Sequence, residues 1–310
     1  MDHVIRTMGG DLDAALAGPV YMHEHLIIDT PLVAATMPHI HLHSVDEAVA
    51  EVQSCVAAGV RTMVDAMPAG SGRNPEKLSR ISILSGIRVV AATGLHTEKY
   101  YVDVPWAGAE TSEQLAERFV ADIETGIDRH DYLGEEVDRT LLRAGIVKVA
   151  ALTETLTLRD QRLFEAGAMT HLRTGVPVLT HTEGGLGGLI QIETLLGHGV
   201  PADRIALSHT DKVSDEGYHR ALLETGVYLC YDQGLRDGAS TMSLLAAMTA
   251  GGWGERLLVG TDGARRSLWA ALGGSPGLAS LYRSAAESFD DDLVEQVFVE
   301  NPARFLSLSR

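Results

Sequence analysis

The stretch GIVKVAALTETLTLRDQRLFEAGAMTHLRTGVPVLTH, residues 145–181, contains one complete strand–helix–strand unit. Its two ends, 145–150 and 176–181, are short apolar runs bordered by glycine or proline, which are typical of buried strands. The segment between them, 158–174, is amphipathic and stops before Gly175, a residue type that favours helix ends. The stretch therefore predicts two parallel strands that are joined by a helix.

The same alternation repeats along the rest of the chain. Strands are expected at eight ranges: 19–25, 60–65, 87–93, 145–150, 176–181, 204–209, 227–231 and 256–262. Helices are expected at 45–58, 75–86, 111–128, 158–174, 186–198, 214–225 and 239–250, and a last helix at about 290–307 would seal the outside of the barrel. Eight such units predict an α/β protein whose parallel sheet closes into a (β/α)8 TIM barrel. No glycine-rich dinucleotide-binding motif follows any of these strands, which disfavours an open doubly wound sheet.

The length of the chain suits one such barrel. A TIM barrel uses roughly 250 residues plus its loops. The chain has 310 residues, of which 45% are hydrophobic, so nearly all of it would be used. We therefore expect a single domain over residues 1–310.

The charge of the chain limits its partners. It has 25 Lys and Arg residues against 42 Asp and Glu residues, a formal net charge of −17. Such a charge repels phosphate backbones and anionic lipid headgroups, so we expect neither nucleic acid nor a membrane as a partner. The opening residues lack the apolar stretch of a signal peptide, and no later window reaches the ~20 apolar residues of a membrane span. We expect a soluble cytoplasmic protein that acts on a small molecule.

His23 and His25 flank Glu24 within an apolar run. Residues two apart in a strand point the same way, so both imidazoles should face the barrel interior. An unsatisfied buried ring costs on the order of 1–3 kcal/mol, and a metal ion is the partner that best suits two adjacent nitrogens. From this pair alone, two core histidines bonded to neighbouring carbonyls remain an equal alternative.

Three more donors stand at the ends of predicted strands. His181 ends the fifth strand, His209 ends the sixth and Asp262 ends the eighth. A TIM barrel places its catalytic groups at this end of the strands. Together with the first two histidines, these residues favour a metal centre over a set of structural histidines.

Lys148 interrupts the apolar fourth strand between Val147 and Val149. Burial and neighbouring positive charge both lower the pKa of a lysine, and the resulting free amine can react with CO₂ to form a carbamate. Two divalent ions bring four positive charges, whereas neutral histidines and Asp262 supply only one negative charge. A carbamate adds a second negative charge and two oxygens that can bridge metals about 3.5–4 Å apart. The alternative is an ordinary interior lysine paired with an acid.

Six segments of the chain resemble those of a known family. They are HEHL at 23–26, GIVKVA at 145–150, THTEGG at 180–185, SHTD at 208–211, GTDGARRS at 260–267 and NPARFL at 301–306. In this order they are similar to the phosphotriesterase-like branch of the amidohydrolase superfamily, whose members include phosphotriesterase-like lactonases. The resemblance runs from about residue 18 to residue 306.

The resemblance implies a binuclear metal site at the C-terminal end of the strands. The implied ligands are His23, His25 and Asp262 on one divalent ion, His181 and His209 on the other, and N6-carboxylated Lys148 as the bridge between them. Zinc is the default ion for such ligands, and manganese, cobalt and iron are alternatives. The resemblance also implies a homodimer.

The resemblance further implies a hydrolytic mechanism. In the family, a hydroxide that bridges the two ions attacks an electrophilic carbon or phosphorus, and one ion polarises the acceptor oxygen. Asp262 and Lys148 are the expected catalytic residues, the first as proton shuttle to the leaving group and the second as the bridge. We expect a lactonase or a related carboxyl-ester hydrolase.

Loops after the strands supply the candidate substrate-binding residues. Those after the third strand are Lys99, Tyr100 and Tyr101, and lactonases of the family place a tyrosine near the attacked carbonyl. Those after the eighth strand are Arg265, Arg266 and Ser267. Because this barrel favours phosphate in its last loops and arginine binds phosphate bidentately, the second group predicts an anionic substrate such as a phosphorylated sugar lactone. Alternatively, both arginines pair with surface acids or with a dimer partner.

Two other functions remain open at this point. A dedicated phosphotriesterase would have a roomy and mostly apolar pocket, whereas Lys99, Arg265 and Arg266 predict a polar pocket that attracts anions. A non-catalytic binding protein would keep a metal for structure only. Closed structural zinc sites use four ligands around one ion, whereas the six donors here suit two ions with open positions.

Overall fold

Eight parallel strands form one sheet in chain order in the computed structural model, which describes residues 3–309. They are β3 (Val20–Glu24), β4 (Thr62–Asp65), β5 (Arg88–Gly94), β6 (Ala144–Ala151), β7 (Val178–Thr182), β8 (Ile205–Ser208), β9 (Tyr228–Tyr231) and β10 (Leu257–Val259). After β10, the amides of Thr261 and Asp262 donate to the carbonyl of His23 in β3 at 3.2 and 2.9 Å, which closes the ring. Each strand overlaps one predicted range, and the (β/α)8 barrel is confirmed.

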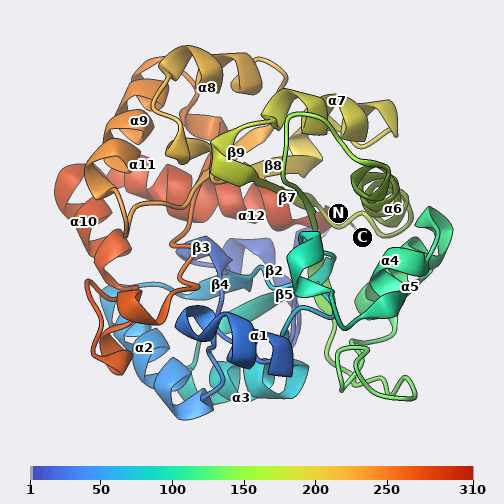
Figure 1. Cartoon of the computed structure of the whole chain (residues 1–310). Helices are drawn as coiled ribbons and strands as arrows, with labels where there is room; N and C mark the ends of the chain where they lie inside the picture. The colour runs from blue at the N-terminus through green and yellow to red at the C-terminus, as the bar shows by residue number, and fades with distance from the viewer. Residues whose placement is uncertain (1–2, 310) are drawn as a thin grey trace.

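Helices surround this sheet, and Figure 1 shows them as an outer ring viewed from the end where the strands stop. The longer ones are α2 (Val45–Ala58), α3 (Pro75–Ser85), α5 (Ser112–Glu124), α6 (Leu158–Thr174), α7 (Gly188–Gly197), α8 (Glu216–Leu223), α9 (Gly238–Ala250) and α10 (Ser280–Ser288). The shorter ones are α1 (Pro31–Thr36), α4 (Pro105–Ala109), α11 (Asp291–Glu295) and α12 (Asn301–Leu306). Within residues 3–309, no helix is long and apolar enough to cross a bilayer.

Local sequence sets the ends of α6. The Thr157 side chain accepts a hydrogen bond from the Asp160 amide, and the Asp160 side chain accepts one from the Thr157 amide, which makes a capping box. At the other end, Gly175 has a φ of 75°, a left-handed conformation that glycine adopts without steric cost. The helix therefore occupies the predicted residues 158–174.

The two ends of the chain cover the N-terminal mouth of the barrel. The antiparallel strands β1 (His3–Thr7), β2 (Gly10–Asp13) and β11 (Leu308–Ser309) form a small sheet there. Ile5 and Phe305 belong to the inner apolar cluster, and the Phe305 ring lies 5.1 Å from that of Tyr228, the first residue of β9. The predicted last helix therefore does not only seal the outside of the barrel. Its final turn, α12, folds under the barrel because Phe305 and Leu306 bury their side chains in the apolar mouth.

A register shift in β3 sets the direction of the first two histidines. Val20 and Met22 belong to the inner cluster, so strict alternation would turn His23 away from the interior. The pairing of β3 with β4 shifts between Tyr21 and Glu24, where β3 has one residue more than its partner. This bulge lets His23 follow Met22 on the inner side.

Gly94, the last residue of β5, lies against the backbone of Lys148. Its φ is +103°, and a Cβ atom at this position would lie 1.9 Å from the Lys148 carbonyl oxygen. We expect Gly94→Ala to lower the free energy of unfolding by at least about 3 kcal/mol, through backbone strain and displacement of β6. Gly86→Ala is the matched control, because Gly86 has a φ of +79° and no atom within 4 Å of the added Cβ. Chemical denaturation should show that the control loses only about 1–2 kcal/mol of unfolding free energy. Equal losses in the two variants would show that the contact of Gly94 with the Lys148 backbone does not matter.

Candidate metal centre and its cavity

Four histidines and one aspartate meet where the barrel strands end. The Nε2 atoms of His23 and His25 lie 3.9 and 3.4 Å from Oδ1 of Asp262. The Nε2 atom of His209 lies 2.9 Å from Nδ1 of His181. The ring centroids of His23 and His209 are 4.9 Å apart, so the two groups adjoin. The structure thus brings the five predicted N and O donors into one cluster.

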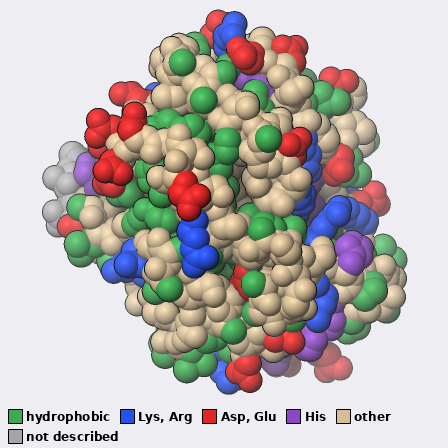
Figure 2. Space-filling model, turned by 90° about the vertical axis from the view of Figure 1, so that its left-hand side faces the viewer, with side chains coloured by type: hydrophobic (Ala, Val, Ile, Leu, Met, Phe, Trp, Pro, Cys, Tyr) green, Lys and Arg blue, Asp and Glu red, His purple; other side chains and the backbone are tan. Residues whose placement is uncertain are grey.

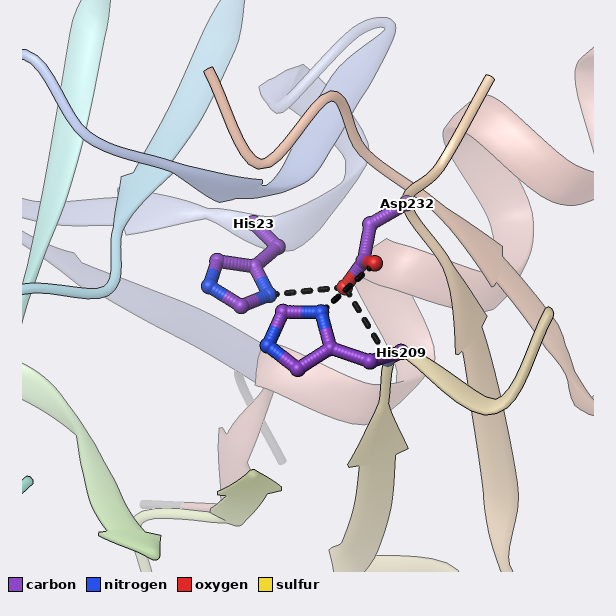
Figure 3. Close-up of side chains that lie close together, drawn as sticks. All are labelled: His23, His209 and Asp232. Carbon is purple, nitrogen blue, oxygen red and sulfur yellow. Dashed lines mark hydrogen bonds and ion pairs between the residues drawn. The ribbon is translucent and has the colours of Figure 1, made fainter. Parts of the chain in front are cut away.

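Asp232, which the sequence analysis did not single out, links these two groups. Figure 3 shows its carboxylate between the rings of His23 and His209. Oδ2 lies 2.8 Å from Nδ1 of His23, and Oδ1 lies 2.8 Å from Nδ1 of His209. Burial alone would raise the pKa of Asp232, but the two histidines hold it well below its usual range. The carboxylate is therefore ionised and accepts a hydrogen bond from each ring.

His181 and His209 face each other, each with one ring nitrogen. Nε2 of His181 lies 2.9 Å from Oε2 of Glu183, and this contact lowers the pKa of Glu183 to about 2. Burial and the neighbouring His209 lower the pKa of His181 to about 3, so the ring is neutral and its hydrogen lies on Nε2. Nδ1 of His181 then points its lone pair at Nε2 of His209. A cation can take the place of a hydrogen between these two nitrogens, because their 2.9 Å separation is close to the roughly 3.3 Å of two nitrogens on a tetrahedral zinc ion.

Lys148 reaches the same cluster from β6. Its side chain is 1% exposed, and Nζ lies 3.1 Å from Oγ of Ser208. Burial lowers the pKa of Lys148 to about 8, although the charges of Asp232 and Asp262 act to raise it. Among residues 3–309, no carboxylate oxygen forms an ion pair with Nζ within 4.0 Å. The free amine that carbamate formation requires is thus accessible near neutral pH.

Arg236 holds the aspartate of the cluster in place. Its Nη2 donates to the backbone carbonyl of Asp262 at 2.6 Å and lies 3.2 Å from Oδ2 of the same residue. Asp262 has a φ of 44°, and this double contact supports that uncommon backbone conformation. Burial acts to raise the pKa of Asp262, but the hydrogen bond with His25 and the charges of His209 and Arg236 hold it well below its usual range.

A cavity of about 240 Å³ opens above the cluster. Besides the histidines and Asp262, its lining includes His39, His96, Lys99, Tyr100, Glu183, Lys212, Gln233, Arg236 and Arg265. Figure 2 shows Lys, Arg and His side chains gathered toward the edge of the molecule that forms the front of Figure 1. A larger open groove of about 820 Å³ lies between α6 and α7 but contains none of the ligands, so we place the site in the smaller cavity.

Three of the predicted substrate-binding residues do not line this cavity. The Tyr101 hydroxyl accepts from the His96 amide at 2.7 Å and donates to the Ala69 carbonyl at 3.0 Å, so it supports the backbone. Arg266 donates to the carbonyl of His41 at 3.0 Å, and Ser267 is exposed outside the lining. By contrast, Lys99, Tyr100 and Arg265 do line the cavity.

Two cationic residues of the lining were missed by the sequence analysis as ligand contacts. Lys212 lies three residues after His209, and Arg236 lies four residues after Asp232. Both follow barrel strands on the side where a TIM barrel builds its site. Their position shortly after a strand was the signal that could have identified them as site residues. The same signal applies to Asp232, which directly follows β9.

Known proteins resemble the chain over nearly its whole length. A model of the phosphotriesterase family matches residues 3–306. A phospho-furanose lactonase of Mycoplasmopsis agalactiae is 30% identical over 235 residues, which are 74% of this chain and 67% of the relative.

Solved structures agree with the sequence comparison. An amidohydrolase from Mycoplasma synoviae superposes with a TM-score of 0.94 at 26% identity, covering 100% of this chain and 93% of the other. The phosphotriesterase homology protein from Escherichia coli, solved with phosphate in its active site, has a TM-score of 0.83 at 25% identity. That match covers 94% of this chain and 99% of the other.

Replacing Lys148 tests whether its amine serves the metal centre. We expect Lys148→Ala to lower the affinity for a second divalent ion at least about tenfold, because the bridging charge is lost. Elemental analysis after equilibration with zinc and bicarbonate measures the ion content. Lys77→Ala is the control, since Lys77 forms a partly exposed pair with Asp29. Two ions held with unchanged affinity by Lys148→Ala would rule out the bridge.

Proposed function

The chain belongs to the phosphotriesterase family, and we propose that it is a two-metal hydrolase that opens the lactone ring of phosphorylated sugars. The observation that carries this proposal is a small, cation-lined cavity directly above a cluster of metal-binding side chains. The cluster supplies hydrolytic chemistry, and the cavity supplies the preference for an anionic ester.

The cluster has the donors for two ions. One set is His23, His25 and Asp262, the other is His181 and His209, and Lys148 would bridge them as a carbamate. Zinc suits these nitrogen and oxygen ligands, and manganese, cobalt or iron would also fit them. Divalent ions held here would lower the pKa of water and polarise the ester carbonyl.

Asp262 is the residue that would move the proton. In lactone hydrolysis, water forms a bond to the carbonyl carbon and the ring C–O bond breaks, which leaves a hydroxy acid. The Asp262 carboxylate is ionised, so it can accept the proton of the attacking water and pass it to the departing ring oxygen. Arg236 keeps that carboxylate ionised and aimed, through its contacts with both the side chain and the backbone carbonyl.

The cavity lining supports an anionic substrate. Lys99, Lys212, Arg236 and Arg265 line it and outnumber its two carboxylates, Glu183 and Asp262, although the whole chain has a net charge of −17. A local group of cations in an acidic protein attracts an anion to that place, and both side-chain types bind phosphate well. The phospho-furanose lactonase and the phosphate-bound Escherichia coli protein agree with this chemistry.

The same cavity argues against a dedicated phosphotriesterase. Its volume of about 240 Å³ is below the roughly 300–1,000 Å³ of pockets that hold drug-sized ligands. A bulky neutral triester would also offer no negative charge to Lys99, Lys212 and Arg265, which line the cavity. We therefore propose that phosphotriester hydrolysis is at most a side activity.

A comparison of matched lactones tests the proposal. We expect the zinc- or manganese-loaded enzyme to hydrolyse γ-lactones of sugar phosphates with a higher kcat/KM than the same lactones without phosphate. Arg265→Met and Lys212→Met should each lower kcat/KM for the phosphorylated lactone about 10- to 150-fold, the value of one charge-assisted hydrogen bond of about 1.5–3 kcal/mol. Both should leave the unphosphorylated lactone nearly unchanged.

Arg266→Met is the control for this experiment, because that guanidinium is bound to the His41 carbonyl outside the cavity. Equal rates with and without phosphate would refute the phosphate preference. If every lactone stays intact while an organophosphate triester is hydrolysed, the lactonase proposal fails and the phosphotriesterase takes its place.

A further inference from the structure

Building on the two-metal centre proposed above, we infer that Asp232 is a positioning residue that couples the two metal subsites. It does so by fixing the tautomer of one histidine from each subsite. His23 belongs to the set with His25 and Asp262, whereas His209 belongs to the set with His181. One carboxylate therefore fixes, in each set, which histidine nitrogen is free to bind a metal.

The carboxylate of Asp232 has no lone pair left for a metal. Oδ2 accepts from Nδ1 of His23 at 2.8 Å and from the His209 amide at 3.2 Å. Oδ1 accepts from Nδ1 of His209 at 2.8 Å and from Nε2 of Gln233 at 2.7 Å. An ionised carboxylate offers about four lone-pair sites, and these four donors occupy them. Although Asp232, His23 and His209 lie close enough to hold an ion together, this arrangement makes Asp232 a hydrogen-bond acceptor and not a ligand.

The contacts of Asp232 decide which nitrogen of each ring is free. An acceptor-only group at Nδ1 places the hydrogen there, so Nε2 of both His23 and His209 carries the lone pair. Nε2 of His23 faces Asp262, and Nε2 of His209 faces His181, which are the other members of the two sets. Metal-bound histidines are generally held by a carboxylate or carbonyl at their second nitrogen, and here one carboxylate serves two.

The backbone around Asp232 is held by a second buried carboxylate. Asp211 accepts from the amides of Asp232 and Gln233 at 3.2 and 2.8 Å, and from the hydroxyl of Thr241 at 2.7 Å. Within residues 3–309, no hydrogen bond joins the Asp211 side chain to His23 or His209. Asp211 therefore provides a matched control, a buried carboxylate one step further from the metal centre.

Asp232→Asn should affect the two subsites unequally. An asparagine amide group placed at the Oδ2 position would face the His209 amide, a donor that cannot reverse. Placed at the Oδ1 position, it faces Nδ1 of His209 and the side-chain amide of Gln233. Both of these groups can switch from donating to accepting a hydrogen bond. The second arrangement is favoured, and it moves the hydrogen of His209 to Nε2. His23 keeps its tautomer, while the His181–His209 subsite loses a lone pair.

The first test measures metal content. We expect Asp232→Asn to hold about one zinc ion per chain where the wild type holds two, with the weaker ion bound about 10- to 100-fold less tightly. Asp211→Asn should lose stability but still bind two ions. Calorimetric zinc titration and elemental analysis give both quantities without an activity assay. Two ions bound by Asp232→Asn with wild-type affinity would overturn the inference.

The second test reads the tautomers directly in the metal-free protein. Nitrogen-15 NMR of the imidazoles should show hydrogen on Nδ1 of His23 and His209 in the wild type, and on Nε2 of His209 in Asp232→Asn. Hydrogen on Nε2 of His209 in the wild type overturns the inference even if the variant does not fold. A wild type with the expected tautomers and two ions but no lactone hydrolysis would refute the proposed function and leave this inference intact.

Discussion

The facing nitrogens of His181 and His209 are held 2.9 Å apart, and the other nitrogen of each ring is hydrogen-bonded to a carboxylate. Glu183 accepts a hydrogen bond from one ring and Asp232 accepts one from the other. Burial keeps His181 neutral, so it cannot place a second hydrogen between them. When both rings are neutral, the two facing nitrogens both carry lone pairs and suit a cation, which supports the proposal that the cluster is a metal centre and not a set of core histidines.

Two of the candidate ligands have an unusual backbone conformation. His209 and Asp262 both have positive φ values, 67° and 44°, which are uncommon for residues other than glycine. Each is held by a partner from a neighbouring loop: Asp232 accepts from the His209 amide, and Arg236 donates to the Asp262 carbonyl. Strain of this kind persists only where surrounding contacts determine it, and two of the four non-glycine residues with positive φ among residues 3–309 are these two candidate ligands.

The sequence predicted the barrel and the six ligand candidates because both depend on simple rules. Apolar runs alternating with amphipathic segments imply parallel strands, and polar residues at strand ends meet at one rim. It did not predict the bulge in β3, because a one-residue shift leaves no mark in the apolar pattern around Met22 and His23. Nor could it separate Tyr100, which lines the cavity, from Tyr101, whose hydroxyl is bound to the backbone. That distinction depends on how one loop folds.

The central claim, that two ions are held by separate sets of side chains, is tested most directly by anomalous X-ray scattering from crystals of the zinc-loaded protein. We predict two peaks. One should lie about 2.0–2.2 Å from the Nε2 atoms of His23 and His25 and a carboxylate oxygen of Asp262, and the other at a similar distance from Nδ1 of His181 and Nε2 of His209. A single peak on the Nδ1 side of the His23 and His209 rings would contradict the account.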